Sequence, residues 1–175
     1  KKIIEKKKIC FLKTHNINGA YKGKRFTTNE FTAGAIYIVR DPRNVLTSLM
    51  NHYSLNESEA LKMINSIYRN LKDENDSENF SNYSFISSWA NNYNSWNKST
   101  NINTLLIKYE DLENNTNNTF RKILNFVNKI DKNEKNINNE RFEAAIKTTN
   151  FEVLKKKEEI EGFEEAAYSI KDRRV

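Results

Sequence analysis

The sequence predicts an α/β domain in which helices flank a parallel sheet. Short apolar runs alternate with segments that carry apolar residues at helical spacing, which is typical of this class. The run at 35–39, Ala-Ile-Tyr-Ile-Val, is continuous and β-branched, as expected for a strand covered on both faces. No run reaches the ~18 apolar residues of a membrane span, and no Gly/Ser linker divides the chain. Residues 1–175 are therefore expected to form a single domain.

The first strand is predicted at residues 9–12, Ile-Cys-Phe-Leu, which lead into a polar loop. Within that strand, we expect Cys10 to be a small buried hydrophobe rather than a catalytic thiol. One cysteine allows no disulfide within the chain, and the first residues lack the long apolar stretch of a secretory signal. We therefore expect a reducing, cytoplasmic location.

The strand at 35–39 is expected to end at Arg40, and a helix to begin immediately after it. Asp41 suits the N-cap of a helix and Pro42 its first position, so the helix should run to about His52. A second helix is expected to start near Ser54 or Asn56. Residues 72–81 are polar and predict a loop. An amphipathic helix with a core-facing stripe is then indicated by Phe85, Trp89, Tyr93 and Trp96.

The second half of the chain repeats the alternation of strand and helix. A strand is predicted at 104–109, ending at Glu110-Asp111. The next helix is indicated by Phe120, Ile123, Leu124 and Val127. A short helix is expected at 140–148, and the charged tail after Phe151 is expected to be partly helical or mobile.

Ligands of parallel sheets bind beyond the carboxyl ends of the strands, so the residues after each strand deserve inspection. In an extended segment Lys13 and His15 share one face. A neighbouring ammonium favours a neutral imidazole, and His15 could then remove a proton from a hydroxyl while Lys13 steadies negative charge. Taken alone, such a pair is more often incidental.

Arg40 lies where a strand gives way to a helix, beside backbone N–H groups that favour an anion. Ser48, about two turns into that helix, could donate its hydroxyl to the same anion. Two structural alternatives remain open. Arg40 could pair with Asp41, and Ser48 could donate to the carbonyl of Asn44.

Four segments together resemble the sulfotransferases that use 3′-phosphoadenosine 5′-phosphosulfate (PAPS). Residues 40–48, with the strand before them, closely resemble the motif of this family that binds the 3′-phosphate. Lys13-Thr14-His15 resembles its catalytic Lys-Thr-His, and 106–112 is similar to its Tyr-Glu-Asp-Leu segment. Residues 149–151 are similar to the stretch that meets the adenine. The four segments occur in the order of the family.

The resemblance implies a role for each matching residue. His15 would be the general base that activates the acceptor hydroxyl, and Lys13 would support charge on the sulfuryl group. The donor PAPS, and its product PAP (3′-phosphoadenosine 5′-phosphate), would be bound by Arg40, Ser48, Tyr109, Thr149 and Phe151. Arg40 and Ser48 would hold the 3′-phosphate, Tyr109 would contact the nucleotide, and the last two would lie near the adenine.

The resemblance also implies a P-loop-like three-layer sandwich, but one incomplete at both ends. The Pro-Lys-Ser-Gly-Thr-Thr-like loop that cradles the 5′-phosphosulfate has no counterpart before Lys13. The Arg-Lys-Gly-type loop of the family would be expected just after residues 172–175. We therefore expect a partial domain with little catalysis of its own and a sheet without one central strand.

The preferred function is sulfuryl transfer from PAPS to a hydroxyl or amine of a small molecule or glycan. One alternative is a non-catalytic module that binds PAP. A basic nucleic-acid-binding domain is the weaker alternative, because only the net charge of +6 favours it. Two histidines and one cysteine offer no convincing metal site. The acceptor pocket would be built from loops such as 16–29 and 70–82, whose polar residues do not identify a substrate. The oligomeric state stays open.

Overall fold

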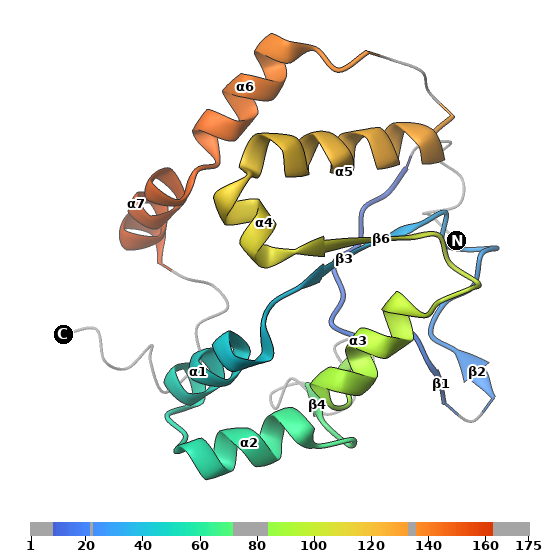
Figure 1. Ribbon diagram of the computed structural model, residues 1–175, viewed down its shortest axis with the longest axis vertical. Helices are drawn as coiled ribbons and strands as arrows, with labels where there is room; N and C mark the ends of the chain where they lie inside the picture. The colour runs from blue at the N-terminus through green and yellow to red at the C-terminus, as the bar shows by residue number, and fades with distance from the viewer. Residues whose placement is uncertain (1–8, 22, 72–83, 133–135, 163–175) are drawn as a thin grey trace.

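A parallel pair of strands forms the centre of the computed structural model, which describes residues 9–21, 23–71, 84–132 and 136–162 (Figure 1). Strand β3 (Ala35–Val39) pairs with β6 (Thr104–Lys108), in a register that runs from Ala35 opposite Thr104 to Val39 opposite Lys108. Helices flank this pair, as predicted. The predicted polar loop at 72–81 and the segment 172–175 lie outside the described residues.

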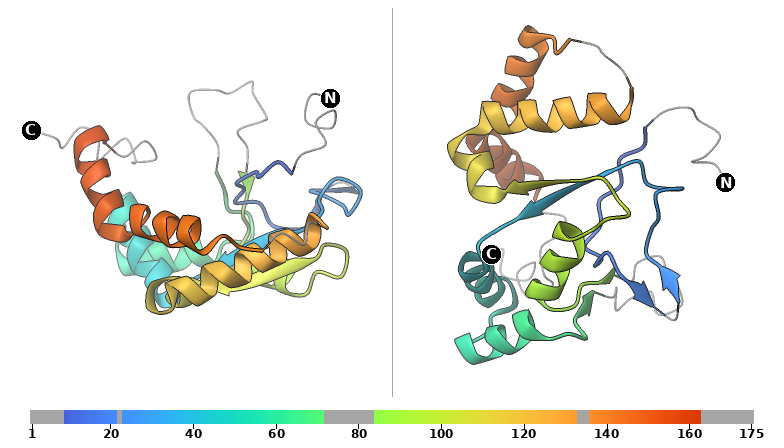
Figure 2. Two further views of the ribbon diagram at one scale, coloured as in Figure 1. Left: turned by 90° about the horizontal axis from the view of Figure 1, so that it is seen from above. Right: turned by 45° about the vertical axis from the view of Figure 1, so that its right-hand side comes forward.

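The two faces of the strand pair are covered differently. Helix α5 (Thr116–Ile130) lies on one side, whereas the chain at 9–18 passes behind the strands on the other (Figures 1 and 2). Helix α3 (Trp89–Asn97) packs beside that second face, where the ring of Trp96 stacks on Tyr37 at 6.1 Å between centroids. Trp96 is buried, so the predicted core role of the aromatic stripe is confirmed for this residue.

The helix after β3 begins where the sequence predicts. Helix α1 (Pro42–Tyr53) has Asp41 as its N-cap, and the carboxylate accepts a hydrogen bond of 2.9 Å from the backbone N–H of Arg43. Helix α2 (Glu57–Asn65) begins after Asn56, which forms a reciprocal capping box with Glu59. The two helices enclose a small core whose buried members are Leu49, Ala60 and Ile64.

The aromatic helix starts later than the sequence predicts. Phe85 lies on β5 (Ser84–Phe85), which pairs antiparallel with β4 (Asn70–Leu71), and is therefore outside α3. Ser87 has a left-handed backbone with φ of 63°, and the hydroxyl of Ser88 caps the helix. Because a left-handed residue interrupts the right-handed helix, α3 cannot extend back to Phe85.

The last third of the chain is helical. Helix α4 (Tyr109–Asn114) follows β6 directly, so the strand ends one residue earlier than predicted. The buried Thr119 hydroxyl donates to the carbonyl of Asp111 at 2.9 Å and ties α4 to α5. Helices α6 (Asn139–Thr148) and α7 (Phe151–Glu161) complete the described chain. The guanidinium of Arg121 covers the ring of Phe142 at 4.3 Å and joins α5 to α6.

The predicted strand at 9–12 is wrong. These residues have no regular secondary structure, Cys10 is exposed, and Phe11 and Leu12 are 70% and 74% exposed. No described strand pairs with them, so the apolar run has no sheet to join. The polar loop that follows contains a short hairpin of β1 (Ala20–Tyr21) and β2 (Lys24–Arg25). Within the described residues, no helix combines the length and apolar character needed to cross a membrane.

Candidate functional site

The register of the parallel pair brings Arg40 and Tyr109 together. Val39 lies opposite Lys108, so the residues that follow them leave the sheet side by side. The guanidinium carbon of Arg40 lies 4.5 Å from the centroid of the Tyr109 ring, which is a cation–π contact. The Nε of Arg40 is buried and has no hydrogen-bond partner among the residues that the structure describes. This guanidinium is therefore held in place on one side and retains unused donor capacity.

The next pair in the same register shows how the two carboxylates beside Arg40 are used. The backbone N–H of Asp41 donates to Oε1 of Glu110 at 3.1 Å. The carboxylate of Asp41 pairs with the Arg43 guanidinium at 2.5 Å, and hydrogen bonds from the side chain and then the backbone of Arg43 lower the pKa of Asp41 to about 2. Asp41 thus pairs with Arg43, and the alternative of an Arg40–Asp41 ion pair is not realised.

Glu110 is also occupied by backbone contacts. Hydrogen bonds from its own backbone N–H and from that of Asp41 lower the pKa of the Glu110 carboxyl below its ordinary value. Both carboxylates next to Arg40 therefore accept hydrogen bonds from groups at the start of a helix. The charge of Arg40 also lowers the pKa of Glu110, so the two groups interact electrostatically although no described ion pair joins them.

A pocket of about 470 Å³ opens between Arg40 and one face of α1. It is lined by six residues with polar side chains: Arg40, Asn44, Thr47, Ser48, Asn51 and His52. Ser48 is exposed, and the alternative bond from its hydroxyl to the Asn44 carbonyl is absent from the described contacts. It is the neighbouring Thr47 that donates back along the helix, to the carbonyl of Arg43 at 3.2 Å. Arg40 and Ser48 therefore face one pocket, and the Ser48 hydroxyl is available there.

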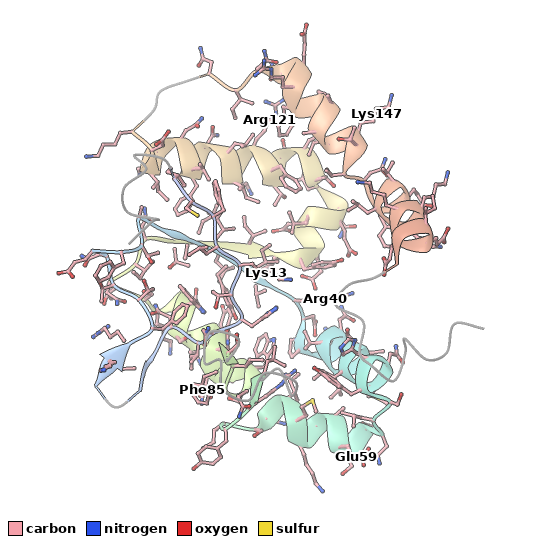
Figure 3. All side chains as sticks on the ribbon, turned by 180° about the vertical axis from the view of Figure 1, so that it is seen from behind. Lys13, Arg40, Glu59, Phe85, Arg121 and Lys147 are labelled. Atoms are coloured by element: carbon pink, nitrogen blue, oxygen red, sulfur yellow. The ribbon has the colours of Figure 1, made fainter. Side chains whose placement is uncertain are left out.

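Lys13 and His15 lie outside that pocket lining. Both side chains are exposed, on the irregular segment that crosses the strands. Figure 3 labels Lys13 on this segment and Arg40 at the point where β3 gives way to α1. The structure therefore groups Arg40, Ser48 and Tyr109 closely, whereas the two residues expected to be catalytic come from a separate element.

Thr149 and Phe151 lie at the junction of α6 and α7. The Thr149 hydroxyl donates to the carbonyl of Ala145 at 2.7 Å, and Phe151, the first residue of α7, is 73% exposed. Neither lines the pocket. Helix α7 does lie at the end of the molecule where β3 and β6 terminate (Figure 1). The ring of Phe151 is thus available for stacking but is not packed against the Arg40 pocket.

Sequence reasoning missed four residues of the pocket lining: Asn44, Thr47, Asn51 and His52. The signal was present, because Asn44, Ser48 and His52 recur every four residues within α1, the spacing that keeps side chains on one helix face. In the described part of the chain, no group of three or more His, Cys, Asp or Glu side chains could hold a metal ion.

The fold and the pocket define an α/β protein with a cationic, polar site where a central strand meets a helix. Residues 4–166 match the family described as Sulfotransferase domain, so the chain belongs to the sulfotransferase family. No curated protein matches the sequence.

Proposed function

We propose that this protein is a sulfotransferase that uses PAPS and binds the 3′-phosphate of the nucleotide between Arg40 and Ser48. Membership of the sulfotransferase family supports a transferase, and residues 1–175 would act as one domain. The acceptor would be a hydroxyl or amine of a small molecule or glycan. A cytoplasmic location is part of the proposal, since a reducing compartment suits a chain with one cysteine.

The observation that carries the proposal is the state of the Arg40 guanidinium. Its Nε is buried without a partner, and leaving a buried donor unsatisfied costs about 1–3 kcal/mol. A phosphate in the adjoining pocket, which Arg40 and Ser48 both line, would accept from the guanidinium and from the Ser48 hydroxyl. A ligand with a phosphate therefore supplies the contact that the protein itself lacks.

Transfer would proceed by attack of the acceptor oxygen or nitrogen on the sulfur of PAPS. The new bond to sulfur forms as the bond between sulfur and the 5′-phosphate oxygen breaks, and PAP leaves. His15 would take the proton of the acceptor, and Lys13 would stabilise negative charge on the sulfuryl oxygens. Most of the catalysis would come from positioning and electrostatics, as in phosphoryl transfer.

The nucleotide site is tested by titrating the protein with PAP in a calorimeter. Loss of a charge-assisted hydrogen bond of about 1.5–3 kcal/mol predicts that Arg40→Ala weakens binding about 10- to 100-fold. Ser48→Ala removes a neutral donor and should cost about 3- to 10-fold. The matched control is Arg25→Ala, which removes one exposed arginine from the distant hairpin strand β2. Equal affinity in Arg40→Ala and Arg25→Ala would rule out the site.

Competition with duplex DNA separates this proposal from nucleic-acid binding. PAP binding that depends on Arg40 and resists competing DNA contradicts a nucleic-acid role. Displacement of PAP by DNA at low salt, with a strong dependence on salt concentration, would support one.

Catalysis is tested in the full-length protein with PAPS and a panel of phenol and amino-sugar acceptors. His15→Ala should abolish transfer and leave PAP affinity nearly unchanged, because the proposed base does not line the nucleotide pocket. Retained turnover would remove His15 as the base.

A second candidate function is a non-catalytic module that binds PAP. The observation in its favour is that Lys13 and His15 lie outside the pocket lining, on an irregular segment. Tight PAP binding by the full-length protein, together with no transfer to any acceptor of the panel, would favour the module over the enzyme.

A further inference from the structure

A line of polar side chains on α3 contacts the backbone next to His15. Its members lie three or four residues apart, so they share one face of the helix and of the turn after it. We call this set the α3 polar stripe: Asn92, Ser95, Trp96 and Ser99. None of the four was expected to have a functional role from the sequence.

The stripe follows the chain from residue 15 to residue 18. Asn92 Nδ2 donates to the carbonyl of His15 at 3.3 Å, and Trp96 Nε1 donates to the carbonyl of Asn16 at 3.0 Å. The backbone N–H of Asn18 donates to the Ser95 hydroxyl at 3.0 Å. The helix thus contacts main-chain groups of residues 15, 16 and 18, which helps to determine where this segment lies.

Asn92 makes three side-chain hydrogen bonds to the described residues. Its Oδ1 accepts from the Tyr37 hydroxyl at 3.0 Å, so the two amide hydrogens of Asn92 point toward acceptors. One reaches the carbonyl of His15 and the other the carbonyl of Ile86 at 2.9 Å. The side chain therefore joins β3, the chain before α3 and the residue proposed as the base.

The segment that carries His15 needs such support. Residues 9–17 have no regular secondary structure, and the side chains of Lys13, Thr14 and His15 are exposed. Phe85 holds the end of this segment, because its backbone N–H donates to Asn16 Oδ1 at 2.8 Å and its carbonyl accepts from the backbone N–H of Ile17 at 2.8 Å. At the His15 carbonyl the contact comes from the stripe, on a helix whose Trp96 is 6% exposed and stacks on β3.

We propose that Asn92 is a positioning residue for His15, acting through the His15 carbonyl as part of the α3 polar stripe. The inference rests on the proposed function, in which His15 is the general base. A displacement of about 1 Å between reacting groups can reduce a rate by about 10²-fold, so a side chain that never touches substrate can control turnover.

The direct test compares Asn92→Ala with Asn94→Ala. Asn94 lies on the same helix, is exposed, and its side chain makes no hydrogen bond to the described residues, so it is a matched control. Backbone order parameters for residues 13–17, measured by NMR relaxation, should fall from about 0.85 to below about 0.6 in Asn92→Ala only. Unchanged order in both variants would overturn the proposal.

Measuring turnover separates a positioning role of Asn92 from a purely structural one. In the full-length protein with PAPS and an acceptor, Asn92→Ala should lower kcat by about 10- to 100-fold and leave the KM for PAPS within about two-fold. Unchanged kcat, or a KM that rises while kcat holds, would also overturn it. If Asn92→Ala does not fold, Tyr37→Phe provides the second variant, because it removes the hydroxyl that orients the amide. A loss of order at 13–17 in that variant is the expected result, and native order there refutes the proposal.

The two proposals fail in different ways. Absence of PAP binding by the wild-type protein would remove the proposed function. The order parameters, measured without nucleotide, would still decide whether Asn92 positions the segment.

Discussion

The aromatic ring beneath Arg40 offers a quantitative test of how the nucleotide site is built. Replacing Tyr109 with Leu removes the ring that lies 4.5 Å from the guanidinium carbon and keeps an apolar side chain. The contact is half-buried, so it should be worth about 1 kcal/mol, between the ~0.5–1 of exposed pairs and the ~2 of desolvated ones. Without the ring, the Arg40 guanidinium gains conformational freedom. Binding of PAP must then restrict the side chain again, which costs free energy. We therefore expect PAP to bind about 5-fold more weakly.

Two further variants determine which part of Tyr109 matters. Tyr109→Phe keeps the ring, so a contact limited to the ring predicts wild-type affinity, whereas a direct bond from the phenol to the nucleotide predicts a loss of about 3- to 10-fold. Tyr68→Leu is the control, because Tyr68 is 78% exposed. The assay is calorimetric titration with PAP at fixed salt. Wild-type affinity in Tyr109→Leu would refute the idea that the ring holds Arg40 for phosphate.

Three other predictions concern the stability of the fold. Gly34→Ala should destabilise the protein by about 1–3 kcal/mol in urea unfolding, because a methyl group there would overlap Ile130 of α5. Ser54→Gly should stabilise it by up to about 1 kcal/mol, since Ser54 ends α1 in the left-handed region with φ of 55°. Burial, together with the charge of Tyr93, raises the pKa of Tyr37 to about 12 from the ordinary 10.0. As the pH rises, the Tyr37 phenol therefore ionises in the unfolded chain before it ionises in the folded protein. Between pH 10 and 12 the free energy of unfolding should fall by about 1–2 kcal/mol, a value discounted for the partial exposure of Tyr37.

Each of these predictions has a control. Gly19→Ala should be tolerated, because the nearest atom to an added methyl group there is 3.6 Å away. Equal unfolding free energies for Gly34→Ala and Gly19→Ala would contradict the packing argument. Ser54→Gly that lowers stability would refute the backbone-strain argument. In Tyr37→Phe the loss of stability between pH 10 and 12 should become smaller, and an unchanged pH profile would refute the assignment to Tyr37.

The elements predicted correctly are those with strong local signals. Asp41 and Pro42 predict the start of α1, and Asn56 with Glu59 forms the capping box of α2. These preferences act within one turn of helix, so they can be read without knowing what packs nearby. The predicted roles of all the site residues remain predictions: Lys13, His15, Arg40, Ser48, Tyr109, Thr149 and Phe151.

The errors occur where a local pattern depends on a distant partner. The apolar run at 9–12 has strand-like composition, but no described strand pairs with it and its side chains stay largely exposed. Phe85 has the right spacing to join α3, yet it pairs across β4 and β5 instead. Periodicity reports which residues share a face, but it does not report which backbone supplies the hydrogen bonds.

The amino-acid order alone determined the family, the two central strands and the position of Arg40 at the start of a helix, since each depends on residues close together in the chain. Tertiary structure alone decided what surrounds Arg40. The parallel register brings Tyr109 under its guanidinium, and Asp41 pairs with Arg43 rather than with Arg40. The same holds for the contact of α3 with the backbone beside His15, because residues 77 positions apart meet only when α3 packs against the segment that carries His15. Such contacts arise from the packing of whole elements, and no short stretch of sequence encodes them.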